Sequence, residues 1–158
     1  MKRLFALAVV LVVLVSSVAA VGASASQAVS GTWQLASIIS ASAQPVGENC
    51  IIEVAYTQNY QGDLVGSVTG QVRIVHLGLC DQPAAEVFHT EGTFEGTVVG
   101  ASGTFDLQGE GKADAQGSVD GQFIFLGGTE GLVNLHGQLT FTGLLSLGGP
   151  YSGDIHFD

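Results

Sequence analysis

Positive charge is what this sequence has least of. Its 158 residues include four Lys and Arg against fourteen Asp and Glu, which gives a formal net charge of −10 at pH 7. Two of the four cations, Lys2 and Arg3, stand at the N-terminus, so Arg73 and Lys112 are the only ones in the rest of the chain. Nucleic acids and anionic membrane surfaces attract basic proteins. The composition therefore argues against both as partners and favours an acidic, soluble protein.

Sequence motifs that carry catalytic chemistry are also missing. There is no G-x-S-x-G nucleophile elbow, no H-E-x-x-H zinc motif and no phosphate-binding P-loop. The acidic residues are scattered, without the D-x-D-x-D-G spacing of a calcium loop, so we interpret them as a source of solubility rather than of a metal site. We therefore expect no cofactor and no metal, and motifs assign no enzyme class.

The first 25 residues have the composition of a secretory signal. Lys2 and Arg3 precede an unbroken apolar run over 4–15, and Ala23-Ser24-Ala25 fits the small-residue pattern of a cleavage site. An uncleaved membrane anchor is the alternative, but the apolar run is shorter than the roughly 20 residues that a spanning helix needs. We predict a single secreted or cell-envelope domain over 26–158, with no membrane association after cleavage.

What the rest of the chain does contain is a two-residue periodicity broken by glycine. The stretch over 91–125 shows it best. Short runs such as 104–107 and 122–125 alternate apolar and polar side chains between Gly-rich joints at 100–103 and 109–111. Alternation with a period of two is typical of an antiparallel sheet with one buried face. The stretch lacks the i, i+3, i+4, i+7 spacing of a helix, so the predicted fold class is all-β.

Turn and loop signals divide the domain into eight strands. Eight antiparallel strands joined in order by short connections suit an up-and-down β-barrel, because closure removes sheet edges that would otherwise pair with other chains. The interior of such a barrel is either filled by side chains or holds one small ligand. The expected strands cover 31–39, 50–60, 64–77, 86–94, 102–107, 119–126, 132–142 and 151–157, with a loop over 40–49 that contains Pro45 and Gly47.

The chain has two cysteines, Cys50 and Cys80. If the turn at 62–63 joins two strands into a hairpin, both cysteines lie at neighbouring strand ends, nearly equidistant from that turn. A pair of cysteines in an exported chain is expected to be oxidised. A redox or metal pair is the alternative, and it lacks C-x-x-C spacing and an adjacent His. We predict a Cys50–Cys80 disulfide.

Glycine and turn motifs occur at 60–64, 91–96, 100–105 and 128–137. They resemble those of a bacterial family of small proteins of unknown function, grouped by fold with plant allene oxide cyclase. The resemblance implies an eight-stranded antiparallel, calycin-like barrel with a central cavity, in some members a dimer, and is nearly silent on chemistry. No catalytic residue of allene oxide cyclase can be placed on this chain.

The sequence departs from that family where the family is polar. Phe88-His89 stands where many members have Glu-Arg, Ala101 where they have Arg, and Gly109 where they have His. These differences weaken the transfer of an ionisable interior site from the family to this chain.

The candidate catalytic groups are Glu53, His89 and Glu91, on strands expected to form the barrel wall. A carboxylate that faces into a barrel loses solvation, which raises its pKa and suits it to act as a general base. Both faces of strand 50–60 carry apolar residues, however. If Tyr56 faces inward, Glu53 is solvated, and alternation alone leaves both orientations open.

Histidines on consecutive strands are the candidate metal ligands. His76 and His89 lie on strands that should pair, and their meeting would provide half of a metal site. A transition metal needs three or four ligands in fixed geometry, and no third is evident. Two surface or rim histidines are therefore the simpler interpretation.

Two functions are compatible with these observations. A secreted barrel that binds a small apolar molecule, or that serves as a structural module, is favoured by the apolar strands and the absent catalytic motifs. Trp33, Tyr56 and Phe123 are its candidate ligand-binding residues. The alternative is an isomerase or cyclase that holds a hydrophobic substrate in the barrel, which requires one of the three candidate catalytic groups to face the cavity. The chain is expected to be a monomer or a homodimer.

Overall fold

The structure is a computed structural model that describes residues 25–158, so 1–24, nearly all of the expected export signal, lie outside it. A single 3₁₀ turn, η1 (Glu130–Leu132), interrupts a chain of strands, and the predicted all-β fold class is confirmed. The strands are β1 (Gln27–Val46), β2 (Asn49–Gly62), β3 (Leu64–His76), β4 (Glu86–Val98), β5 (Ala101–Ala113), β6 (Ser118–Gly128), β7 (Leu135–Leu144) and β8 (Gly149–Phe157).

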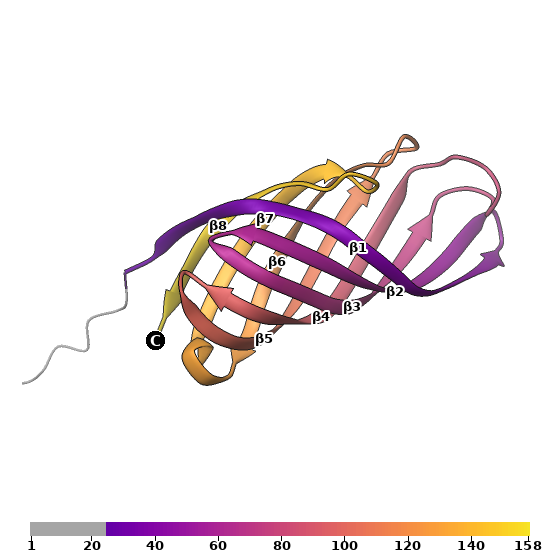
Figure 1. Ribbon diagram of the computed structural model, residues 1–158. Coiled ribbons are helices and arrows are strands. Elements are labelled where there is room, and N and C mark those ends of the chain that lie inside the picture. Colours follow the sequence, from indigo (N-terminus) through magenta and orange to yellow (C-terminus); the bar gives the residue numbers. More distant parts are fainter. Residues whose placement is uncertain (1–24) are drawn as a thin grey trace, which may run out of the picture.

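Each strand pairs antiparallel with the next one along the chain, and the sheet closes on itself. Closure is made by β1 and β8, whose pairing runs from Gln27 opposite Ile155 to Trp33 opposite Gly149. The strand order is therefore that of a closed barrel, β1 to β8 in sequence. Figure 1 shows the strands wrapping obliquely around one axis. The predicted ring of eight antiparallel strands is confirmed.

One end of this ring is filled by aromatic side chains, and we call it the closed end. It carries the turns at 62–63 and 99–100 and lies beside the C-terminus in Figure 1. The Phe105 ring contacts the rings of Phe94 and Phe125, with centroid distances of 4.7 and 4.3 Å. Leu132 of η1 covers this cluster and is fully buried. Such packing leaves no space for a ligand between the strands here.

Tyr60 and Tyr151 complete the packing of the closed end. Their ring centroids lie 5.7 Å apart, and both side chains are buried. The Tyr151 hydroxyl accepts a hydrogen bond from the Leu64 amide at 2.9 Å and donates to the Gln61 carbonyl at 3.3 Å. A buried tyrosine hydroxyl needs such partners. They tie β8 to the hairpin between β2 and β3.

Two glycines inside β5 leave space for neighbouring aromatic rings and do not mark a turn. The prediction of a joint at 109–111 is wrong, since β5 continues through these residues to Ala113. A methyl group on Gly109 would overlap the Phe123 ring, and one on Gly111 would overlap the Phe88 ring. Glycine in a strand often marks such a close approach. The glycines that we interpreted as a turn signal instead allow close packing against aromatic rings.

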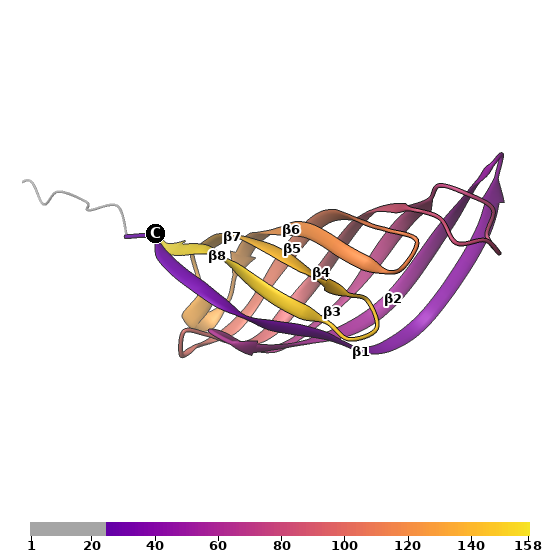
Figure 2. The same ribbon diagram turned by 90° about the horizontal axis from the view of Figure 1, so that it is seen from above.

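The loop predicted over 40–49 is also wrong, because β1 continues to Val46. Its pairing with β2 runs to Val46 opposite Asn49, leaving a two-residue turn. Gly47, at the first turn position, has φ +64°, as a type II′ hairpin turn requires. The far half of β1 is therefore half of a long hairpin with β2, which reaches beyond β8 in Figure 2.

The Cys50–Cys80 disulfide is present, with a Cα–Cα distance of 5.1 Å. It joins the start of β2 to the loop that connects β3 and β4, as the hairpin geometry predicted. It lies at the end of the ring opposite the aromatic cluster, which we call the open end. The turns at 47–48 and 114–117 lie at the same end.

Candidate functional site

The open end contains an apolar cavity of about 240 Å³ between the strands. Its wall is formed by aromatic and aliphatic side chains, and Glu86 is the only charged residue among those that the structure places there. The lining residues are Trp33, Leu35, Ile38, Val54, Tyr56, Gln58, Val72, Ile74, Glu86, Phe88, Thr90, Val119, Phe123, Phe141 and Leu145. A mostly apolar hollow with a few polar groups is the usual form of a small-molecule site.

The structure brings the three candidate ligand-binding residues together. Trp33, Tyr56 and Phe123 come from β1, β2 and β6, and all three line this cavity. Phe123 stacks on Phe141 at 4.5 Å between centroids, and Trp33 meets Phe141 edge-on at 6.0 Å. The Trp33 indole donates to the Thr142 carbonyl at 3.1 Å, which fixes the ring against the wall. Their binding of a ligand stays a prediction.

Tyr56 and Thr90 form a directed hydrogen-bond relay in the cavity wall. The Thr90 hydroxyl donates to the Gln71 carbonyl at 2.9 Å, and it lies 2.7 Å from the Tyr56 hydroxyl. Because Thr90 has a single hydroxyl hydrogen, Tyr56 donates to Thr90. Burial raises the pKa of Tyr56, and the Thr90 hydrogen bond offsets part of that rise. Tyr56 therefore stays neutral and keeps lone pairs that can accept a hydrogen bond.

The mouth of the cavity is at the rim of the open end. Ile38 and Leu145 both line the cavity and are 59% and 42% exposed, so the hollow reaches solvent between them. Glu86 lies on the rim, at the start of β4. The entrance is thus apolar on one side and carries a carboxylate on the other.

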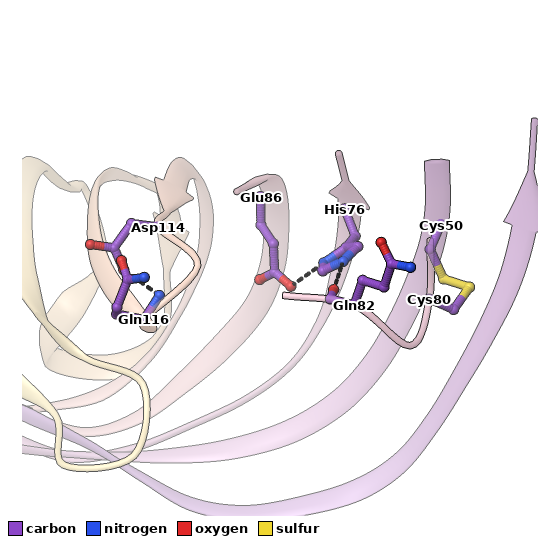
Figure 3. A network of polar contacts seen from close by, with 7 residues as sticks. All are labelled: Cys50, His76, Cys80, Gln82, Glu86, Asp114 and Gln116. Atoms are coloured by element: carbon purple, nitrogen blue, oxygen red, sulfur yellow. Dashed lines mark hydrogen bonds and ion pairs between the residues drawn. A yellow bond between two sulfur atoms is a disulfide. The ribbon is translucent and has the colours of Figure 1, made fainter. Parts of the chain in front are cut away.

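His76 lies at the rim beside the disulfide and is hydrogen-bonded through both ring nitrogens, as Figure 3 shows. Its Nδ1 lies 2.9 Å from Glu86 Oε1, and its Nε2 lies 2.8 Å from the Gln82 carbonyl oxygen. A carbonyl and a carboxylate only accept, so this geometry favours the doubly protonated imidazolium. The hydrogen bond to Glu86 is the main reason that the pKa of His76 is raised. The side chain therefore ties the connection between β3 and β4 to the first residue of β4.

The three candidate catalytic residues lie on the outer surface. Glu53, His89 and Glu91 are exposed and line an outer groove of about 450 Å³ together with Arg73. Glu53 Oε1 pairs with Arg73 Nη1 at 3.5 Å, and both side chains are more than 60% exposed. A catalytic role required one of these side chains to face into the barrel, and none does. On β2, Tyr56 and the other even-numbered residues face inward, so Glu53 faces outward.

The two candidate metal-ligating histidines do not meet. His76 is paired across the sheet with Glu86, whereas His89 is paired with Arg73. Within residues 25–158, no group of three or more His, Cys, Asp or Glu side chains is arranged to hold a metal ion. His76 lies at the rim, buried and with both ring nitrogens hydrogen-bonded, and His89 is exposed on the outer surface.

Sequence reasoning did not single out Val72, Phe88 or Thr90 as lining residues. The alternation of Phe88, Thr90 and Phe94 on β4 was the available signal, since residues two apart share a face of a strand. It identifies the inner face of β4 once one of these residues is known to be buried. Phe94 is fully buried, so Phe88 and Thr90 face inward with it.

Comparisons with known proteins agree on the fold and leave the chemistry open. A family model described as "Protein of unknown function (DUF3224)" matches residues 27–144. A crystal structure of a protein of unknown function from the DUF3224 family of Shewanella oneidensis MR-1 is similar, with a TM-score of 0.68 and 18% identity. The similarity covers 85% of this chain and 98% of that one. No curated protein matches the chain.

These similarities bear on the resemblance seen in the sequence. A family of unknown function is what the glycine and turn motifs indicated, and that part is confirmed. The grouping with plant allene oxide cyclase stays a prediction. At 18% identity, the likeness to the Shewanella protein shows the shared fold alone.

Proposed function

Because the chain belongs to the DUF3224 family of proteins of unknown function, we propose a function from its own site: the open-end cavity binds a small, neutral, apolar molecule. The cavity is the observation that carries this proposal. It has a volume of about 240 Å³, and its wall is almost entirely apolar. Burial of apolar ligand surface against such a wall is favourable at about 25 cal/mol per Å².

The volume sets the size of the ligand. An apolar cavity of about 150 Å³ in another protein stays dry and accepts benzene. A cavity of about 240 Å³ therefore has room for a molecule somewhat larger than benzene, such as isopropylbenzene. A long acyl chain would extend through the mouth into solvent and leave much of its apolar surface exposed.

Charge sets the preference for a neutral ligand. Glu86 at the mouth is an acid, and the His76 imidazole beside it is already hydrogen-bonded to it. The whole chain carries a formal net charge of −10. A carboxylate ligand would meet like charge at the rim and lose its hydration inside, and both effects oppose binding.

The hydrogen bond from Tyr56 to Thr90 favours neutral ligands that carry a hydroxyl group. Its oxygen has unused lone pairs, because its hydrogen is donated to Thr90. A ligand hydroxyl that donates to Tyr56 would gain about 0.5–1.5 kcal/mol over a purely apolar ligand of the same shape. Phenols and alcohols with a compact hydrocarbon body are therefore the favoured class.

Titration calorimetry with three matched probes tests the proposal. We expect 4-isopropylphenol to bind at least as tightly as isopropylbenzene, and 4-isopropylbenzoate to bind at least tenfold more weakly, since tenfold corresponds to about 1.4 kcal/mol. Trp33 is the only Trp and lines the cavity, so its fluorescence gives a second readout of the same event.

Two valine variants on β3 provide the control. Val72→Phe places a ring in the cavity and should abolish binding of all three probes, whereas Val65→Phe adds the same ring on the outer surface, where Val65 is 53% exposed. Retained binding in Val72→Phe, or no binding of isopropylbenzene to the unmodified protein, would contradict a cavity site.

We further propose that the protein works outside the cytoplasm. The signal-like composition of its first 25 residues supports this, and the Cys50–Cys80 disulfide is consistent with an oxidising, extracellular compartment. Among residues 25–158, no helix is long and apolar enough to cross a membrane. Intact-mass analysis of culture medium and cell fractions, with and without reduction, tests export. A full-length, reduced cytosolic chain would contradict it.

A further inference from the structure

The far half of β1 presents a sheet edge that is unpaired within residues 25–158. β8 pairs with β1 only up to Trp33, whereas β2 follows the other side of β1 to Val46. Every residue from Ala36 to Val46 is exposed. Figures 1 and 2 both show this segment reaching past the end of β8. Its outer edge is therefore free to hydrogen-bond with another strand.

The hairpin geometry identifies which peptide groups point to that free edge. In a two-residue hairpin the closing pair, here Val46 and Asn49, is hydrogen-bonded, and hydrogen-bonded pairs then alternate along the ladder. Ser42 and Gln44 accordingly bond to β2, whereas Ala41 and Ala43 direct their N–H and C=O groups outward. The backbone of Pro45 also points outward, so its missing N–H removes no hydrogen bond to β2.

The edge lacks the charges that commonly protect exposed strands. Natural sheets block such edges with lysine or other charged side chains, yet no charged residue occurs over 25–47. Two register shifts lie before Ser40, and the pairing from Ser40 to Val46 is regular. In a chain with net charge −10, this uncharged edge is a surface on which two copies can approach without strong repulsion.

We propose that this edge pairs with the same edge of a second copy, antiparallel and about a two-fold axis at Ser42. Ala41 of one protomer then exchanges two hydrogen bonds with Ala43 of its partner, and the symmetric pair does the same. Two-fold pairing of one surface with itself is the commonest way to build a homodimer. Glu53 lies opposite Ser42 on β2, so the two Glu53 side chains stay three strand spacings, about 14 Å, apart.

A cysteine pair tests the register of this dimer. The two Ser42 residues would form a non-hydrogen-bonded pair, whose Cα spacing of about 4.5 Å suits a disulfide. Ser42→Cys should therefore give a covalent dimer of twice the monomer mass under mild oxidation. Ser40→Cys is the matched control on the same face. Its two cysteines would lie about 13 Å apart, so we expect at least a tenfold slower formation of the covalent dimer.

A proline scan tests whether the edge carries the association. Ala43→Pro removes an outward N–H and spares the bonds to β2, so the variant should keep its circular dichroism and thermal midpoint but remain monomeric. Sedimentation of the unmodified protein should show a dimer that grows with concentration, with Ser42→Ala behaving the same way. Unmodified protein that stays monomeric at about 1 mM, equal cross-linking of the two cysteine variants, or a folded Ala43→Pro dimer would overturn the proposal.

Discussion

The closed end and the open end are built from the same eight strands, yet aromatic rings fill one and stand around the edge of a cavity in the other. At the closed end, Phe94 and Phe105 stack between the neighbouring strands β4 and β5 at 4.7 Å, and Leu132 is fully buried. At the open end, Trp33 and Phe123 pack on Phe141 along the wall. The difference teaches that a tightly packed interior and an open cavity can be separated along one barrel axis.

The means of stabilisation differ in the same way. The closed end depends on burial, with Phe94, Val98 and Leu132 wholly inaccessible to solvent. The open end depends on cross-links at its rim: the Cys50–Cys80 disulfide and the bonds of His76. A cavity removes packing contacts from its lining. We expect the rim bonds to offset this loss by holding together the strands around the cavity.

The largest expected effect is the difference between two Phe→Ala substitutions on β4. Phe94→Ala at the closed end should lower the free energy of unfolding by about 3–5 kcal/mol, because it deletes a fully buried ring and leaves a void. Phe88→Ala, on the cavity wall, should cost about 1–2 kcal/mol, since one side of its ring faces space already. Urea unfolding under non-reducing conditions measures both. Equal losses would remove the distinction between the two ends.

The next effect concerns the cross-link of the open end. Replacing Cys50 and Cys80 together by Ala should lower the free energy of unfolding by about 3–4 kcal/mol, because the loop between the cysteines, separated by 30 residues, becomes free in the unfolded chain. Hydrogen exchange should rise in the 77–85 connection and not at Leu132. An unchanged unfolding midpoint, or faster exchange at the closed end, would contradict this assignment.

The smallest effect is the pH dependence contributed by the rim. The pKa of His76 is raised above 6.5 in the folded protein, chiefly by its hydrogen bond to Glu86. A raised pKa means that the stabilisation is complete below the unfolded-state pKa near 6.5 and is lost as pH rises through the folded value. The unfolding midpoint should therefore fall on going from pH 6 to 8.

A matched pair of histidine variants isolates that contribution. His76→Gln should flatten the decline between pH 6 and 8. His136→Gln, at the closed end, should leave the decline as it is, because His136 is about half exposed and contacts only the exposed side chains of Asp158 and His156 among the pairs that the structure describes. If the two variants have the same pH profile, the His76 bonds do not stabilise the rim.

Much of the fold could be predicted because it depends on local patterns. Alternation in runs such as 104–107 identified strands, and the position of Cys50 and Cys80 about one hairpin turn identified their bond. The far half of β1 was missed since residues 40–43 are small and uncharged and every residue from Ala36 to Val46 is exposed, on both faces of the strand. Without a buried face, such a strand has no periodicity to detect.

The candidate site was predicted in part, and the reason lies in long-range packing. We could choose Trp33, Tyr56 and Phe123 because large aromatic side chains are usually buried. The orientation of Glu53 could not, since both faces of β2 carry apolar residues. Its outward direction follows from Tyr56, whose hydroxyl meets Thr90 on β4. Gly109 was misread for a similar reason, because the ring that occupies its space comes from β6.

The most direct test of the account is the position of a bound apolar probe. In NMR spectra of the protein with isopropylbenzene, we expect nuclear Overhauser effects from the probe methyl groups to the rings of Tyr56, Phe123 and Trp33, and none to Phe105 at the closed end. Contacts at the closed end, contacts confined to the outer groove near His89, or no contacts at saturating probe would contradict a binding cavity at the open end.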